Sequence, residues 1–453
     1  MTGEIRKMVM EARDRAAEAG MDASIEVHHE NSHLMRIGNS SVSLNTSEEL
    51  TRFDIEVIKG RRRGTHTLLG EVDSADELFR IMQEVAEKAE CSGEMDYAPV
   101  LPVISRTLDQ SSQYDPELEK LDPSVKEAVY SEIIRSCGEE YDYSGAWSSG
   151  SVETFVVTTA GRNSSRTLLT DQQFTCVLKH PKRKWELAHW QTGWKAGAVT
   201  AGNTVENFSS FLPVYERNEG FRVEPGRYKV VFGSQALGEL TGMAVWTGCH
   251  GRAWEMKTAW TSSKKPGDKV FHESITVLDD PSSENVFSSP MSDSGLPTET
   301  IPMISGGKLS SLMYDRNTAS KYGKEPTASA GCLSMLPGEG PADLSEALKD
   351  HDMVLYIPAI HYMNLPNMSR GIFTGSSRFS AVLMKNGRVV SPIFSSRVTD
   401  SFERVFGNVL GLSSETVSVN TSNTYGRRSP SALSVPSWIL VDDVKITDCA
   451  DSF

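Results

Sequence analysis

Apolar and polar residues recur with two different periods along the N-terminal half of the chain. Residues 3–19 and 74–89 place apolar side chains three and four positions apart, which predicts two amphipathic helices. Ser74 and Glu77 form a capping box at the start of the second helix. Between them, segments such as 53–59 alternate apolar and polar residues, as half-buried strands do. This half therefore predicts helices packed on a sheet.

The same half continues beyond a connector at residues 92–120 that is rich in Pro, Ser and Asp. Asp122 and Pro123 predict the start of a helix, with proline at its first position, and Gly138 predicts its end. Four predicted strands follow, at residues 152–159, 165–170, 174–178 and 185–190.

A break in the pattern at residues 215–225 separates this half from the next. Residues 228–233 are a short β-branched and aromatic run closed by a glycine, and residues 234–248 then show helical spacing. Short strands dominate the rest of the chain. Together with the helices and the sheet of the N-terminal half, they predict an α+β fold. Its predicted parts are an N-terminal helices-on-sheet domain, residues 1–218, and a β-rich C-terminal domain, residues 219–453, which carries the 234–248 helix.

Two local patterns stand out later in the C-terminal half. Asn386 and Gly387 predict a two-residue hairpin turn. Farther on, residues 402–410 predict a helix with one apolar face, formed by Phe402, Val405, Phe406, Val409 and Leu410.

Composition indicates a soluble protein that works in a reducing compartment. The chain has 453 residues, of which 38% are apolar, and this length favours more than one core. Its net charge of −14 argues against nucleic acid and anionic membranes as partners. The 6 cysteines form no Cys-x-x-Cys pair, and neither a signal-peptide core nor an apolar run of about 20 residues is present. We therefore expect a cytoplasmic protein with no membrane partner.

The first candidate for metal chemistry is His29-Glu30-x-x-His33, which reads as a zinc-protease motif. That motif binds zinc only on a helix, where its two histidines share a face. Here it lies between two alternating segments, in what the pattern predicts to be a polar turn. On a strand the histidines would lie about 13 Å apart, too far for one metal ion. We interpret the motif as a chance match.

Two further groups of residues allow a functional and a plain structural interpretation. His250, Glu255 and His272, near Cys249, form the other cluster with metal-binding chemistry, and they are an alternative candidate site. The simpler interpretation is that the two histidines are structural. The run from Gly60 to Gly64 contains three adjacent arginines. It is typical of a solvated hairpin tip, and the alternative is a contact with an acidic partner surface.

Several landmarks resemble the TldD/PmbA family along nearly the whole chain. They are the strand and helix at 228–248, Asp279-Asp280-Pro281, the segments 292–298, 306–309 and 314–316, and the hairpin at 386–387. Zinc-bearing members of that family carry His-Glu-x-x-x-His on the helix and a cysteine in a late loop. An ungapped match places Gly242, Met243 and Thr247 at the helix positions, and the corresponding loop, residues 423–430, has no cysteine. Glycine, methionine and threonine supply neither zinc ligands nor a base that activates water.

The resemblance therefore implies the TldE/PmbA-like branch, which lacks the zinc motif. It implies a non-catalytic subunit of a cytosolic metallopeptidase, with no cofactor in this chain and zinc in a TldD-type partner. Such complexes degrade unfolded peptides or trim leader peptides, so this chain would be inactive without its partner. The alternative is a stand-alone homodimer that binds a peptide or small ligand in the vestigial cleft. The family's older name, modulator of DNA gyrase, is not supported by the negative charge.

Overall fold

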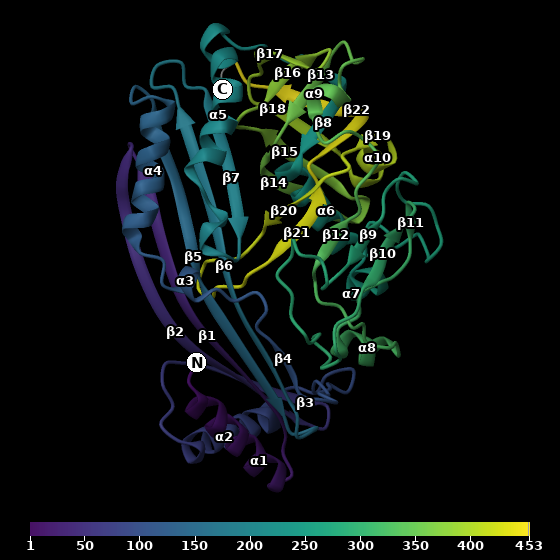
Figure 1. Cartoon of the computed structure of the whole chain (residues 1–453). Helices are drawn as coiled ribbons and strands as arrows, with labels where there is room; N and C mark the ends of the chain where they lie inside the picture. Colours follow the sequence, from purple (N-terminus) through teal and green to yellow (C-terminus); the bar gives the residue numbers. More distant parts are fainter. Residues whose placement is uncertain (452) are drawn as a thin grey trace.

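The computed structural model describes residues 1–451 and 453, and its strands form three sheets (Figure 1). The first sheet has 7 strands in the order β3-β2-β1-β5-β6-β4, with β7 paired to β6. All of its neighbours are antiparallel except β4 and β6. The strands are β1 (Asp22–Gly38), β2 (Ser41–Lys59), β3 (Arg62–Leu69), β4 (Leu108–Gln110), β5 (Asp142–Thr158), β6 (Ser164–Lys179) and β7 (Glu186–Gly193).

Helices cover this sheet with two separate groups of apolar side chains. The elements are α1 (Gly3–Glu18), α2 (Ala75–Cys91), α3 (Pro116–Glu119), α4 (Pro123–Cys137), the 3-10 turn η1 (Ala196–Ala198) and α5 (Ala201–Arg217). Leu78 and Met82 of α2 pack with Val9 of α1 against Phe53 of β2. The predicted cap of α2 is confirmed, since Ser74 accepts a hydrogen bond from the Glu77 amide.

The other two sheets belong to the C-terminal half. The nine-stranded sheet has the order β14-β15-β18-β22-β8-β13-β16-β17, with β19 paired to β22, and the six-stranded sheet has the order β11-β10-β9-β12-β21-β20. The nine strands are β8 (Gly226–Gly233), β13 (Val354–Ile357), β14 (Ile360–Asn367), β15 (Ile372–Ser377), β16 (Val382–Lys385), β17 (Arg388–Pro392), β18 (Ser396–Ser401), β19 (Val409–Leu412) and β22 (Trp438–Cys449). The six are β9 (Val277–Asp279), β10 (Ile301–Ser305), β11 (Lys308–Leu309), β12 (Leu333–Met335), β20 (Thr416–Asn420) and β21 (Ala432–Pro436).

Helix α6 (Ser234–Gly248) contacts strands of both of these sheets, so it lies within the core of the C-terminal half. The remaining helices are short: α7 (Gly251–Glu255), α8 (Arg316–Tyr322), α9 (Leu344–Ala347), the 3-10 turn η2 (Met368–Arg370) and α10 (Phe402–Gly407). The expected α+β class, with helices on a sheet followed by a β-rich half, is confirmed. No helix within the described residues is long and apolar enough to cross a membrane.

The two halves share a core at the point where the sequence predicts a domain boundary. Every described strand of the first sheet precedes residue 218, and every strand of the other two sheets follows residue 219. However, Trp147 and Tyr215 pack in one apolar cluster with Val231 and Leu440. The boundary between residues 218 and 219 therefore stays a prediction.

The polar turn predicted around His29 is wrong, because β1 is one continuous strand through this region. Its polar side chains find partners on both faces of the sheet, so the chain has no need to turn towards solvent there. The turn lies instead at Asn39 and Ser40, whose φ values of 50° and 57° are left-handed.

Two other predictions need adjustment, and one helix was not predicted. The strands predicted at 165–170 and 174–178 form the single strand β6. Helix α10 ends at Gly407, so Val409 lies in β19 and Leu410 is 50% exposed. Helix α5 was not predicted, because Pro213 lies inside it and many of its exposed positions are polar.

Candidate functional site

Strand β8 runs directly into α6 at the centre of the C-terminal half. Gly233 joins the two, and a Cβ atom there would lie 2.9 Å from the Cα of Pro358. A Cβ on Gly238 would lie 2.8 Å from Cγ1 of Val419, so α6 also packs tightly on β20. The predicted helix at 234–248 is confirmed, and these two glycines fix its position.

The three positions that the family resemblance singles out lie on this helix but offer no metal ligand. A Cβ at Gly242 would meet Cδ2 of Leu433 at 3.5 Å, an ordinary contact with β21. Met243 packs against the apolar core, and Thr247 donates its hydroxyl hydrogen to the Met243 carbonyl at 2.6 Å. The residues present therefore do not fit a zinc ion.

Glu239 is the one ionisable residue of α6, one turn before Gly242 on the helix. Among the described residues it has no hydrogen-bond or ion-pair partner, and burial raises its pKa to about 7. A lone carboxyl group at this position does not form a metal site.

The structure does not bring His250, Glu255 and His272 together. Glu255 accepts a hydrogen bond from the Tyr314 hydroxyl at 2.9 Å, and His272 Nδ1 lies 2.8 Å from the Ser274 hydroxyl. His250 is the residue that precedes α7. Within residues 1–451 and 453, no three His, Cys, Asp or Glu side chains are placed to hold a metal ion. The geometry therefore assigns these residues separate, local contacts.

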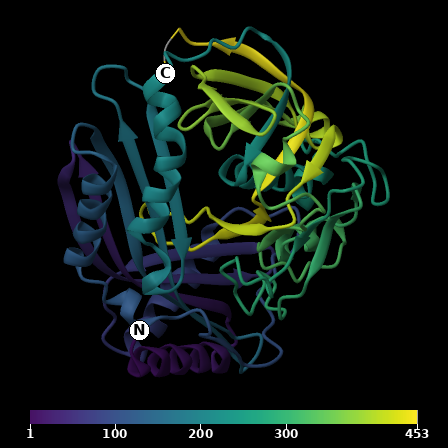
Figure 2. The same cartoon turned by 45° about the horizontal axis from the view of Figure 1, so that its top comes forward.

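The loop between β20 and β21, residues 421–431, contains the segment 423–430 that the family resemblance singles out, and it reaches across to the first sheet (Figure 2). Because α6 packs on both β20 and β21, the helix and the loop belong to one assembly. The two elements that the family resemblance singles out, α6 and this loop, are thus neighbours in the fold.

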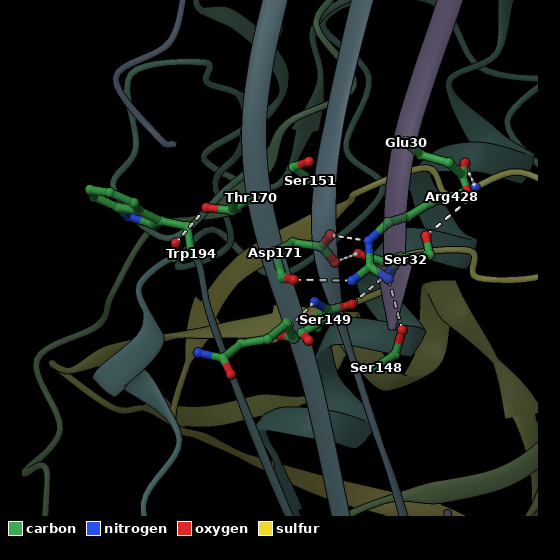
Figure 3. Close-up of polar contacts among 12 residues, drawn as sticks. Glu30, Ser32, Ser148, Ser149, Ser151, Thr170, Asp171, Trp194 and Arg428 are labelled. Atoms are coloured by element: carbon green, nitrogen blue, oxygen red, sulfur yellow. Dashed lines mark hydrogen bonds and ion pairs between the residues drawn. The ribbon is translucent and has the colours of Figure 1, made fainter. Parts of the chain in front are cut away.

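Arg428 anchors the loop by hydrogen bonds from its side chain and its backbone (Figure 3). It is 2% exposed, and its Nε donates to Oδ1 of the fully buried Asp171 at 2.6 Å. Its Nη1 donates to the Ser148 hydroxyl at 2.8 Å, and its Nη2 donates to the Asp171 carbonyl at 3.0 Å. The backbone amide donates to Oε2 of Glu30 at 2.7 Å. This buried pair is therefore well satisfied by hydrogen bonds.

Glu30 belongs to the His-Glu-x-x-His motif, and the structure separates it from the two histidines. Its carboxylate lies 2.6 Å from Nε2 of His28 and accepts a hydrogen bond from Ser32 at 3.0 Å. Burial opposes its ionisation, but these hydrogen bonds and the one from Arg428 outweigh burial and lower its pKa. Glu30 is thus an anchor for the loop.

His29 and His33 point to the opposite face of β1, because side chains alternate along a strand. His29 Nδ1 lies 3.0 Å from the Thr51 hydroxyl, and His33 Nδ1 lies 2.9 Å from the Ser47 hydroxyl. Burial lowers the pKa of both histidines. The glutamate and the histidines therefore cannot act on one metal ion.

Arg427 makes a second, more exposed set of contacts with the first sheet. Its Nη2 donates to Glu26, and its Nε lies 3.2 Å from Nδ1 of His28. Its Nη1 lies 3.6 Å from Oδ2 of Asp54. The loop thus carries two adjacent arginines, one buried and one partly exposed, that hold the two halves together.

Sequence reasoning did not find this contact. Arg428 and Asp171 are 257 residues apart, and Arg428 and Glu30 are 398 residues apart. The only local signal was the pair of adjacent arginines in a loop, which is normally a solvated feature.

Comparisons with known proteins identify the relatives of this assembly. Residues 225–448 match the family described as PmbA/TldA metallopeptidase C-terminal domain. The structure of TldE from Thermococcus kodakarensis aligns with a TM-score of 0.83 at 15% identity, over 98% of this chain and 100% of that one. A putative modulator of a DNA gyrase from Thermotoga maritima aligns at 0.80 and 15% identity, over 98% and 100% of the two chains. One from Bacteroides thetaiotaomicron aligns at 0.80 and 15% identity, over 98% and 99%. No curated protein sequence matches the chain.

Proposed function

The chain belongs to the TldD/PmbA family, and from this premise we propose that it is the non-catalytic subunit of a two-subunit cytoplasmic metallopeptidase. In this proposal a zinc-bearing TldD-type subunit supplies the metal and activates water. This chain completes the cleft, which admits unfolded peptides or leader peptides and excludes folded proteins. Closing a cleft over a metal removes water and favours extended chains.

The observation that carries this proposal is the chemistry of α6 and its neighbouring loop. Gly242, Met243 and Thr247 lie on this helix, and the ungapped match to the family sets them at the positions of the zinc motif; the loop carries Arg427 and Arg428. The loop arginines are engaged in ion pairs with the first sheet. A scaffold that is intact but lacks ligands supports a role as a partner of a catalytic chain.

A surface suited to such a partner lies along the free edge of β2 (Figure 1). Strand β3 pairs with β2 only over residues 52–59, and residues 41–49 are all exposed. Residues 41–47 contain no charged residue and no proline, and Val42 and Leu44 are each 40% exposed. Unpaired, unguarded strand edges join strands of other chains. This edge is about 30 Å long at roughly 3.4 Å per residue.

A homodimer that binds a small ligand is the second candidate, and a cavity beside α6 favours it. The same edge could pair with its own copy in antiparallel fashion about a twofold axis. In addition, a cavity of about 170 Å³ lies beside the start of α6, where Gln235, Ser418 and Asn420 line it with polar groups. A nucleic-acid partner is not part of either proposal, because the net charge is −14.

The proposal is tested by the assembly that this edge forms. We expect the chain to bind a zinc-bearing TldD-type chain in sedimentation velocity, and Val42→Lys with Leu44→Lys to abolish the complex, since lysines guard strand edges. The matched control is Leu69→Lys, which changes a 62% exposed residue at the end of β3. Retention of the complex by the double variant would remove the edge from the proposal. A dimer of this chain alone that never exchanges with the zinc-bearing chain would favour the second candidate.

A further inference from the structure

A cavity of about 320 Å³ lies at the point where β3 separates from β2. Strand β3 pairs with β2 as far as Leu69, opposite Arg52, and the amide of Gly70 then donates to the Thr51 carbonyl at 2.9 Å. Beyond this point the edge of β2 is open within the described residues, over positions 41–49. A strand that pairs with this edge would lie in line with β3 and pass the mouth of the cavity.

The cavity combines apolar and acidic lining residues. The apolar side chains that line it are those of Ile5, Phe53 and Val72. Phe53 is 1% exposed, so this part of the lining belongs to the core of the sheet. Three exposed carboxylates also line the cavity, and together they are called the acidic rim: Glu49, Glu71 and Asp73. A side chain with an apolar stem and a cationic end is complementary to both parts.

The acidic rim has no strong countercharge within the described part of the chain. Of the basic groups there, only His29 reaches it, with Nε2 3.9 Å from Oε1 of Glu49. Burial lowers the pKa of this histidine, which favours its neutral form. The ammonium group of Met1, which also lines the cavity, pairs instead with the buried Glu153 at 3.2 Å. The rim therefore keeps its negative charge.

The arginines between Gly60 and Gly64 make their contacts at the far end of the β2–β3 hairpin. Arg62 donates to backbone carbonyls at the end of α2. Arg63 pairs with Glu56, with its Nε 2.9 Å from Oε1. Only Arg61 of the three is exposed. The predicted solvated tip is therefore confirmed for Arg61, whereas the other two arginines make internal contacts, and none of the three neutralises the rim.

The open edge and the cavity face the same added strand. Glu49, Thr51 and Phe53 are alternate residues of β2 and all line the cavity, so the cavity lies on their face of the sheet. Residues directly opposite each other on neighbouring strands point to the same face, with Cβ atoms about 5 Å apart. The residue of an added strand opposite Glu49 would therefore point toward the cavity.

We propose that this cavity is a socket for a lysine or arginine side chain on a partner strand that pairs with residues 41–49 of β2. The stem of that side chain packs on Phe53 and Val72, and its cationic end reaches the acidic rim. Charge complementarity of this kind selects the partner and fixes its register on the edge. The owner of the strand, the zinc-bearing subunit, rests on the proposed function, but the chemistry of the socket does not.

The same chemistry disfavours a second copy of this chain as the partner. Residues 37–51, which such a copy would present, contain no lysine or arginine. Antiparallel pairing about a twofold axis at Asn45 would set Glu49 opposite Ser41 of that copy. The acidic rim would then stay without a cation, so the socket distinguishes a basic strand from the chain's own edge.

Fluorescence anisotropy of labelled strand peptides with the whole chain tests the socket without the partner subunit. The probe alternates threonine and valine around one central lysine and is capped at both ends, and matched peptides carry norleucine or glutamate at that position. We expect the lysine peptide to bind about tenfold more tightly than either, because both lack a charge-assisted hydrogen bond. Glu49→Gln with Glu71→Gln should remove this preference. The matched control is Asp76→Asn, at a nearby carboxylate that already pairs with Arg15.

The same variants in the complex with a zinc-bearing TldD-type chain separate the socket from the proposed function. We expect the double variant to weaken that complex about tenfold in sedimentation velocity, and Asp76→Asn to leave it unchanged. A complex that the double variant leaves intact, equal binding of the three peptides, or no binding of the lysine peptide would each overturn the socket. Absence of any complex would contradict the proposed function, and the peptide series would then still decide on the socket.

Discussion

Lys126 is a buried lysine whose ammonium group has no carboxylate partner among the described residues. It is 2% exposed, and its Nζ donates to the Ser149 hydroxyl at 2.8 Å. Burial and, as a smaller cause, the positive charge of Arg428 together lower its pKa to about 7. The folded protein therefore tolerates this side chain best in its neutral form.

This shift predicts a pH dependence of stability. Between pH 7 and about 10 the unfolded chain binds a proton at Lys126 that the folded chain does not, since the unfolded pKa is about 10.4. The free energy of unfolding should therefore rise with pH, by up to about 1.4 kcal/mol per pH unit. In Lys126→Met this contribution is absent. Urea unfolding at pH 7, 8 and 9 measures both slopes, and identical slopes would contradict the assignment.

At the scale of elements, the loop between β20 and β21 is held mainly by Arg428. Arg428→Ala leaves Asp171 charged and buried without its partner, which costs about 3–5 kcal/mol of unfolding free energy. Arg427→Ala is the control, because its ion pair with Glu26 is about one third exposed on both sides and is worth about 1 kcal/mol or less. Guanidinium unfolding of the two variants measures the difference. Equal losses would show that the buried pair does not fix the loop.

Helix α10 provides the corresponding test for the C-terminal core. Phe406 is 1% exposed, and its ring centroid lies 4.8 Å from that of Phe271. Phe406→Ala should cost about 3–5 kcal/mol through lost burial and a cavity. Leu410→Ala, at a half-exposed site in β19, should melt close to the wild-type temperature. A Phe406 variant that melts like the wild type would show that the ring does not belong to the core.

Elements with a complete local signal were predictable from the sequence. The helix at 234–248 follows from its apolar spacing, and the hairpin at Asn386 and Gly387 follows from its turn residues. Strand β1 was not predictable as one continuous strand, because Glu30 and its polar neighbours are typical of a turn in the sequence. In the fold the Glu30 carboxylate is buried and hydrogen-bonded. Its partner Arg428 comes from the far end of the chain. Contacts of this kind depend on the folded topology rather than on local propensity.

At the scale of the molecule, the candidate site is an assembly of distant parts. It includes the three helix positions that lack zinc ligands, the loop that reaches the first sheet, and the free edge of β2. These parts come from different regions of the chain. The family resemblance pointed to the helix positions and the loop. It did not point to the arginine anchor or the open strand edge, since both depend on which strands become neighbours.

Peptide cleavage by separate and mixed subunits tests the central claim most directly. An unfolded peptide is incubated with this chain, with a zinc-bearing TldD-type chain, and with both, in the presence and absence of a chelator. We predict cleavage only in the mixture, and its loss with chelator, because in the proposed function the zinc-bearing chain supplies the metal that activates water. Robust cleavage by this chain alone would contradict the account.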